Sequence, residues 1–366
     1  MTMNACRPPE EQLRAILQSG IQAPSAENRH YLRFELEPDR VSLVSTDTPT
    51  WAALPHRRVL ALVSYGAVVE NMALCAAALG HAQATQWFPD PARTELVAEL
   101  RWSPAPPTSD PLATAIASRH TNRRFFRRKP VEAAALQRLS AAASAVNGAQ
   151  VRWLDGSQRR LGLQAVRIAE TERFRREALH QELFSAVRFD VGWKRTTEEG
   201  LPPGALEVEP PMRAAFAALR RWALMRRLSR LGGHHALGMR AAYLPCALAP
   251  RLGMLLCDAD NDWLAATGAG RALERTWLAA TAEGLAFQPM AAATALSHQR
   301  AGSGWVGEPA QREIHRLLDQ LTGGRAGAAY MFFRIGHAAA PSVATERPPL
   351  DRFLLPAPVP ETVTLS

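Results

Sequence analysis

The chain has 366 residues, of which 47% are hydrophobic and 21% are charged, and its formal net charge is +9. This length allows two domain-sized units, or one domain built from two related halves, and the composition is that of an ordinary globular protein. Lysine occurs only at Lys129 and Lys194, so nearly all of the basic charge is Arg, and it is scattered without the interleaved aromatic residues of a nucleic-acid-binding surface. We therefore expect no nucleic-acid partner.

No signal-peptide pattern and no run of about eighteen uncharged apolar residues occurs, so we expect a cytoplasmic protein without a membrane partner. The cysteines lack CxxC spacing, which favours reduced thiols. They are Cys6, Cys75, Cys246 and Cys257. A zinc site built from the last two and the pair His234–His235 would lack the close spacing of structural zinc ligands. We expect no bound metal.

The first part of the chain is predicted to alternate between helices and short strands. Apolar residues recur at helical spacing in 9–19, and the Ala-rich segment 66–79 is apolar on all sides, as a buried helix is. Strands are predicted at 31–36, 40–44 and 60–64. A Pro/Ser/Thr-rich linker at 104–110 then separates a first half, 1–103, from a second half, 104–366.

The second half is longer and contains more helix. Strands are predicted at 150–154, 251–257 and 328–335, and helices at 131–143, 159–181, 212–231, 270–282 and 311–321. The segment 190–211 contains two Pro pairs and three Gly, so we expect it to bury little and to act as a mobile segment or a lid. The helix at 212–231 is basic and amphipathic, and packing on the body of the protein is favoured over contact with a membrane. The Pro-rich tail after Gly336 is expected to wrap over the surface.

Two segments of the chain repeat. The segment 66–80, which begins Gly-Ala-Val-Val-Glu, matches the segment 270–284, which begins Gly-Arg-Ala-Leu-Glu, 204 positions later. A Ser-x-x-Asn pattern at 25–28 recurs at 144–147, only 119 positions later, so the second half is expected to carry an insertion of 85 residues. We expect an α+β fold in which two halves with the same order of elements form an intramolecular pseudo-dimer. Each half would have an antiparallel or mixed sheet flanked by helices.

A cluster of hydrogen-bond donors lies just after the linker. The consecutive residues are Arg119, His120, Thr121, Asn122 and Arg123. A phosphate monoester is bound best by charge-assisted, bidentate donors, which Arg supplies, while Thr and Asn add neutral hydrogen bonds. The cluster therefore predicts an anion clamp, and the alternative is a solvated basic loop. The first half lacks a counterpart of it.

This cluster resembles the Arg-x-Ser-x-Arg/Lys motif of the nitroreductase family of FMN flavoproteins, in which the motif holds the FMN phosphate and ribityl chain. Thr121 stands where the family commonly has Ser. The segment Ala-Pro-Ser-Ala-Glu-Asn at 23–28 is similar to the Ala-Pro-Ser-x-x-Asn turn that reaches FMN from the partner subunit in family dimers. Because both halves lie in one chain, the resemblance is closer to the tandem, Acg-type members.

Two further segments carry the resemblance. Trp277–Thr281, followed by 284–290, is similar to the helix and loop whose backbone runs beside the flavin ring near N5, although 288–292 lacks the Gly or Glu-Gly pair that is frequent there. Arg347-Pro-Pro-Leu350 resembles the closing Arg-x-Pro-Leu element, whose Arg adds to the phosphate clamp. The resemblance spans about residues 11–355, and the order of the motifs is its most specific feature.

The resemblance implies one FMN per chain and a monomer that forms its own pseudo-dimer. The implied cofactor-binding residues are Pro24, Ser25, Asn28, Arg119, His120, Thr121, Asn122, Arg123, Pro289, Met290, Ala291 and Arg347. The implied function is NAD(P)H-dependent, two-electron reduction of nitroaromatics, quinones or related electron-poor substrates, which requires no catalytic acid–base side chain. The alternative is a non-catalytic FMN-sequestering protein in which the insertion at about 190–231 closes the flavin site.

Overall fold

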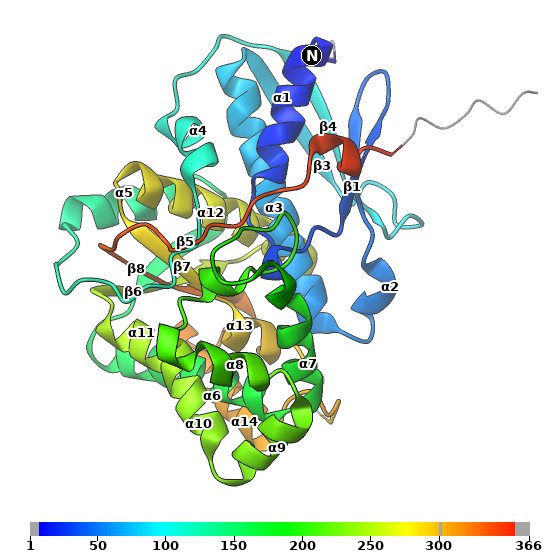
Figure 1. Ribbon diagram of the computed structural model, residues 1–366. Coiled ribbons are helices and arrows are strands. Elements are labelled where there is room, and N and C mark those ends of the chain that lie inside the picture. Colours follow the sequence, from blue (N-terminus) through cyan, green and yellow to red (C-terminus); the bar gives the residue numbers. More distant parts are fainter. Residues whose placement is uncertain (1–6, 300–301, 356–366) are drawn as a thin grey trace, which may run out of the picture.

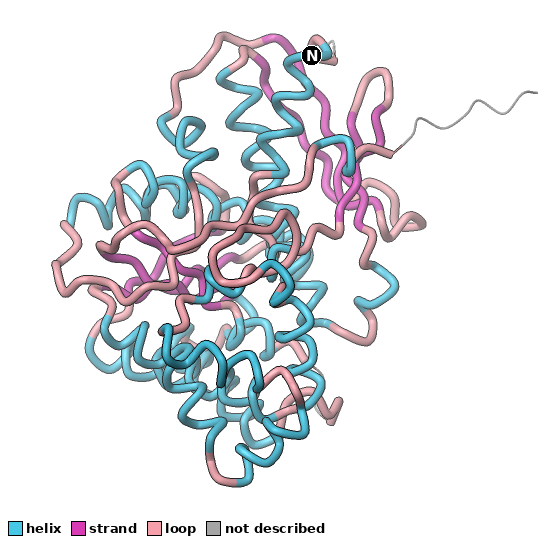
Figure 2. The backbone as a smooth tube through the Cα atoms, in the orientation of Figure 1, coloured by secondary structure: helices cyan, strands magenta, loops and turns pink. Residues whose placement is uncertain are grey.

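The computed structural model describes residues 7–299 and 302–355 and has an α+β fold with two four-stranded antiparallel sheets (Figures 1 and 2). The first sheet consists, in spatial order, of β1 (Leu32–Leu36), β2 (Val41–Ser45), β4 (Leu96–Pro104) and β3 (His81–Trp87). The second consists of β5 (Ala149–Trp153), β6 (Arg251–Cys257), β8 (Ala329–Gly336) and β7 (Ala286–Met290). The predicted α+β class is confirmed, and both sheets have the same strand order when the strands are counted within each half.

Helices flank both sheets. The first half contains α1 (Glu10–Ile21), α2 (Thr48–Trp51) and α3 (Pro55–Ala78). The second half contains α4 (Pro111–Ala115), α5 (Ala133–Ser144), α12 (Asp262–Ala282), α13 (Ala292–Ser297) and α14 (Glu308–Thr322). An insertion between β5 and β6 adds α6 (Gly156–Arg175), α7 (Glu177–Ala186), α8 (Arg213–Ala218), α9 (Trp222–Arg230), α10 (Gly233–Gly238) and α11 (Leu244–Leu248). Most of these inserted helices form the lower part of the molecule in Figure 1.

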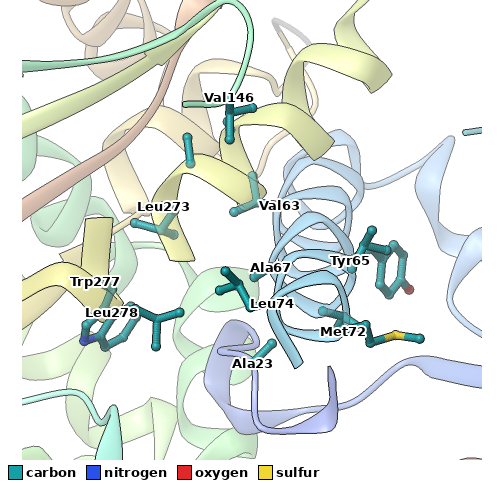
Figure 3. Close-up of a cluster of buried hydrophobic side chains, with 14 of the residues drawn as sticks. Ala23, Val63, Tyr65, Ala67, Met72, Leu74, Val146, Leu273, Trp277 and Leu278 are labelled. Carbon is teal, nitrogen blue, oxygen red and sulfur yellow. The ribbon is translucent and has the colours of Figure 1, made fainter. Parts of the chain in front are cut away.

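The largest apolar cluster is centred on α3 and α12, which pack against each other (Figure 3). Val63 of α3 and Leu273 and Leu278 of α12 are 5% exposed or less. Burial of one such side chain contributes roughly 1.5–3 kcal/mol. Among the described helices, α3 alone is long and apolar enough to cross a membrane, but 72% of its most apolar stretch is buried inside the protein. The helix therefore belongs to the core, as its Ala-rich sequence predicts.

Several predicted elements are confirmed and others are wrong. The strands predicted at 150–154, 251–257 and 328–335 are β5, β6 and β8. The strand predicted at 60–64 is instead part of α3, because its apolar residues are buried by helix packing rather than in a sheet. The single helix predicted at 159–181 ends at Arg175 and a new one begins at Glu177, and the helix predicted at 212–231 is divided into α8 and α9.

The expectation that 190–211 buries little is wrong for 200–205, while the rest of the segment is exposed or half-buried. All five residues from Leu201 to Ala205 are buried, and the Leu201 N–H donates to the Ala186 carbonyl at 2.7 Å. A side chain on Gly204 would overlap the Trp193 carbonyl. Because Pro has no N–H that needs a partner, this Pro-rich segment can be covered with few hydrogen bonds.

The segment after β8 crosses from the second sheet to the first. Leu354 pairs in parallel with Phe34 of β1, and the Leu355 N–H donates to the Phe34 carbonyl at 2.9 Å. The tail up to residue 355 therefore wraps over the body as predicted, and it links the end of the second half to the sheet of the first.

Candidate functional site

A cavity of about 490 Å³ lies where the first half, the second half and the insertion meet. One wall comes from the turn at 23–31 and from α3. A second comes from Thr121, Arg123, Trp277 and the end of β7, and a third from α6, α7, α8 and α10 of the insertion. Most of the lining is apolar, with a limited set of polar groups, as is usual for small-molecule sites.

The turn at 23–28 has a strained backbone that shapes the first wall. Glu27 and Asn28 have φ values of 58° and 56°, in the left-handed region that few residues other than Gly adopt. Pro24, Ser25 and Glu27 line the cavity. Two consecutive left-handed residues away from any Gly are a costly conformation, and such strain tends to occur at functional sites.

Asn28 is predicted to contact the cofactor, but it does not line the cavity. Its amide nitrogen donates to the carbonyls of Glu198 and Gly200, both at 3.1 Å, and its Oδ1 accepts from Arg347 Nη1 at 2.6 Å. Asn28 therefore joins the turn to the insertion and to the C-terminal segment. These hydrogen bonds fix the turn that forms the cavity wall, on the side that faces away from the cavity.

Arg119 is predicted to bind phosphate, yet it too lies outside the cavity lining. Its side chain is only 3% exposed, its guanidinium lies 4.4 Å from the centre of the Trp277 ring, and its Nε lies 3.2 Å from Glu274 Oε1. Burial lowers the pKa of Arg119, against the opposing effect of Glu274. Burial also raises the pKa of Glu274 to about 7, although Arg119 opposes this. The two groups form a buried ion pair.

Arg347 lies beside this pair and behind the same turn. It donates to the carbonyls of Ile21 and Ala23, both at 3.1 Å, in addition to Asn28. Burial and the nearby Arg119 lower the pKa of Arg347 to about 9. Arg119 and Arg347 lie close together, since the Nη2 atoms of both donate to the carbonyl of Gln22, but neither of them lines the cavity.

The other residues of the Arg-rich cluster lie in three different environments: exposed to solvent, buried in the protein, or lining the cavity. His120 is exposed. Asn122 is buried, and its amide nitrogen donates to the Ala339 carbonyl at 2.8 Å. Thr121 and Arg123 line the cavity. Burial, and then the nearby Arg173, lower the pKa of Arg123 to about 10.

The end of β7 completes the second wall. Pro289, Met290 and Ala291, which the resemblance implies run beside a flavin ring, all line the cavity. Within residues 7–299 and 302–355, β7 pairs with β8 alone and is the edge strand of its sheet, so its other side has no strand partner there. The indole of Trp277 lies next to this strand and stacks on Phe287 at 4.8 Å.

A set of charged side chains in the cavity is absent from the sequence prediction. Arg173 of α6 bridges Glu27 and Glu170, with an N–O distance of 3.2 Å to each. Burial raises the pKa of Glu27 to about 7, against the opposing effect of Arg173. Glu27 occupies a variable position of the Pro-Ser-x-x-Asn pattern, so the only available signal was that this turn contains one carboxylate.

A second charged group on the same cavity comes from α3 and α7. Glu182 lies 3.2 Å from His56 Nε2 and 2.6 Å from Arg57 Nε. Burial alone would raise the pKa of Glu182, but the contacts with His56 and Arg57 outweigh it and lower the pKa to about 2. Glu182 is therefore ionised at neutral pH, whereas the pKa of Glu27 lies near neutral pH. Among the described residues no group of three or more His, Cys, Asp or Glu could hold a metal ion.

Solved structures similar to this chain are nitroreductases, several of them described with bound FMN. A putative nitroreductase in complex with FMN from Desulfovibrio desulfuricans is 16% identical, with a TM-score of 0.35, over 69% of this chain and 100% of that chain. The FMN-dependent nitroreductase NfnB from Mycobacterium smegmatis, in complex with NADPH, is 18% identical, with a TM-score of 0.31, over 62% and 87%. An FMN- and NADPH-dependent NfnB from Sphigopyxis sp. strain HMH is 20% identical, with a TM-score of 0.33, over 66% and 96%.

No family model and no curated protein matches the chain. With TM-scores below 0.5, the solved structures do not assign a ligand to this cavity.

Proposed function

We propose that this chain is an FMN-dependent oxidoreductase of nitroreductase type, related to the tandem Acg-type proteins. The observation that carries the proposal is that one cavity gathers three sequence motifs that are far apart in the chain. Pro24 and Ser25 come from the first half, Thr121 and Arg123 from the Arg-rich cluster, and Met290 from the end of β7. Each of these three segments resembles a flavin-binding segment, and their meeting in one cavity supports the proposal.

The chemistry of the cavity suits FMN. Its apolar walls, including Trp277 and Met290, match a flat aromatic ring system, and the guanidinium of Arg123 matches a phosphate. We assign phosphate binding to Thr121 and Arg123, and contacts with the ring to Pro24, Ser25 and the segment 289–291. Bound FMN would supply the hydride and electron transfer. Arg119, Asn122 and Arg347 are assigned a positioning role, since their contacts fix the turn and the C-terminal segment.

We further propose that 1–103 and 104–366 form a pseudo-dimer within one chain and bind a single FMN. The common strand order of the two sheets supports this arrangement. The asymmetry of the cavity supports one site, because its third wall belongs to the insertion, which has no counterpart in the first half. We expect the protein to act as a cytoplasmic monomer that uses NADH or NADPH to reduce a nitroaromatic, quinone or other electron-poor substrate.

A specific observation keeps FMN sequestration as a second candidate. Leu206, Met212, Phe216 and Leu219 of the insertion all line the cavity, so the insertion covers a site that would otherwise be open on that side. If this cover does not open, a nicotinamide cannot reach the flavin. We therefore propose that the lid consists of the whole inserted region and not of 190–211 alone.

The visible absorption spectrum of the purified protein tests the proposal. We expect the bands of oxidised flavin, either as purified or after reconstitution with FMN, and their loss when NADH or NADPH is added anaerobically. Protein that takes up no FMN would refute the proposal. Flavin that is bleached by dithionite but by neither nicotinamide would favour sequestration over catalysis.

A further inference from the structure

The insertion contains a long stretch with charge of a single sign. Between Glu209 and Asp258 there is no acidic residue, whereas there are eight Arg. Two of these Arg have roles in the fold, since Arg240 pairs with Glu209 and Arg251 with Asp155. Five of the others are grouped on and just before α9.

We refer to residues 220–231 as the basic tip. Its inner side packs on the protein: Met225 is fully buried, and Trp222 and Leu228 are half-buried beside the same small core. Its outer side carries arginines that are all exposed. They are Arg220, Arg221, Arg226, Arg227 and Arg230. None of the five forms an ion pair with any acidic residue of the part of the chain that the structure describes.

Apolar side chains interrupt this basic surface. Leu224 is 41% exposed and Leu231 is 86% exposed. On a helix, positions 224, 227 and 231 share one face, so Leu224, Arg227 and Leu231 alternate along the outer side. The chain turns sharply after Leu231, where Gly232 has a φ of 83°, and α9 and α10 meet at the lower end of the molecule in Figure 1. Leu231 thus lies at the outward turn between two helices.

We infer that the basic tip docks the protein onto an anionic lipid surface. Each Arg near such a surface is attracted to the lipid phosphates, and an exposed Leu at a convex turn can enter the boundary between headgroups and acyl chains. Because Met225 and its neighbours already fix α9 on the body, binding needs no refolding of the helix. A nucleic acid or an acidic protein would satisfy the arginines but would leave Leu231 without a favourable environment, so a lipid surface fits better.

The amphipathic pattern at 212–231 favours packing on the body without a membrane partner, but in the structure packing uses only the inner side of α9 and leaves its outer side exposed. Phe216 and Leu219, immediately before the basic tip, line the cavity. The inference does not depend on whether the cavity binds a flavin.

Vesicle flotation with the full-length protein tests the inference. We expect binding to vesicles of phosphatidylcholine mixed with phosphatidylglycerol, little binding to phosphatidylcholine alone, and release as the salt concentration rises. The double variant R226Q/R227Q is expected to bind on the order of thirtyfold more weakly, and L231S about tenfold more weakly. The matched control is R128Q/K129Q, which removes two exposed positive charges outside the tip and is expected to bind as the wild type does.

Three outcomes would overturn the inference. The first is equal binding to both kinds of vesicle, or to neither. The second is an equal loss for R226Q/R227Q and R128Q/K129Q, which would indicate attraction by net charge alone. The third is normal binding by L231S together with complete displacement by RNA, which would make the tip a polyanion-binding surface. All substituted residues are exposed, and thermal unfolding of each variant confirms that it is folded.

Discussion

Gly66 of α3 and Gly270 of α12 make reciprocal contacts where the two helices cross. A Cβ atom on Gly66 would overlap the carbonyl oxygen of Thr267, and one on Gly270 would overlap the carbonyl oxygen of Val63. Thr267 and Gly270 stand 204 positions after Val63 and Gly66, so the same contact is made twice with the roles of the helices exchanged. A twofold axis between two related halves produces this pattern, which supports the proposed pseudo-dimer.

Replacing either glycine by Ala should destabilise the protein. The added methyl group meets backbone atoms of the facing helix, so α3 and α12 would have to move apart, and we expect G66A and G270A each to lose about 1–3 kcal/mol or more of unfolding free energy. Urea denaturation measures this loss. Gly327 has open space around its Cβ position, so G327A is the matched control and should unfold close to the wild type. Wild-type stability in G270A would contradict the close crossing.

The α3–α12 crossing shows how far the sequence could predict the fold. The repeat of Gly and Glu at 204 positions was visible, and it correctly aligned the two helices that meet at the centre. The strands β3 and β4 were missed, since His81–Trp87 alternates small and polar residues with few β-branched ones. Pairing with β4, rather than local preference, makes β3 a strand. Such long-range pairing leaves no local signal.

The candidate site was predicted by motif, and motif position alone does not say which side of the chain faces a cavity. Of the two Arg in the Arg-rich cluster, Arg123 lines the cavity and Arg119 points to Glu274 and Trp277. The charged cavity residues on α6 and α7 could not be foreseen, because the lid was expected only at about 190–231 and nothing in the sequence placed α6 and α7 beside the turn at 23–28. That placement depends on tertiary contacts such as the one between Arg173 and Glu27.

Arg119 is expected to be important for stability. The variant R119M would leave Glu274 buried without its partner, and breaking such a pair costs about 3–5 kcal/mol. Replacing both partners, in R119M/E274M, removes the unpaired charge and should recover much of the loss. Denaturation midpoints of the two variants test this. The control R138M breaks the exposed pair with Glu283 and should change the midpoint little. If R119M is as stable as the wild type but does not bind FMN, Arg119 would instead be a phosphate-binding residue.

Glu27 predicts a dependence of stability on pH. Its pKa is raised from 4.5 to about 7 by burial, against the opposing effect of Arg173, so the folded state holds a proton more tightly than the unfolded state. The folded state therefore binds more protons between pH 4.5 and 7, and the unfolding free energy contributed by this group falls as the pH rises through that range. The full penalty, on the order of 3 kcal/mol, is present above about pH 7.

The variant E27Q isolates this effect. Gln keeps the shape of the side chain but does not titrate, so E27Q should gain stability relative to the wild type as the pH rises from 4 to 8. Urea denaturation of both proteins across this range gives the difference directly. Below about pH 4.5, where Glu27 is protonated in both states, the two proteins should respond to pH in parallel. A difference that stays constant from pH 4 to 8 would show that Glu27 is not buried as a neutral acid.

Arg123 should discriminate between FMN and riboflavin, which lacks the phosphate. If its guanidinium holds the phosphate, R123Q loses a hydrogen bond to a charged group, and its FMN dissociation constant should rise about ten- to hundredfold. Its affinity for riboflavin should remain near that of the wild type, because the contacts with the ring are unchanged. Quenching of flavin fluorescence measures both affinities. R128Q, which removes an exposed Arg that does not line the cavity, is the matched control. Equal loss of FMN and riboflavin binding in R123Q would indicate a collapsed cavity, and wild-type FMN binding would place the phosphate elsewhere.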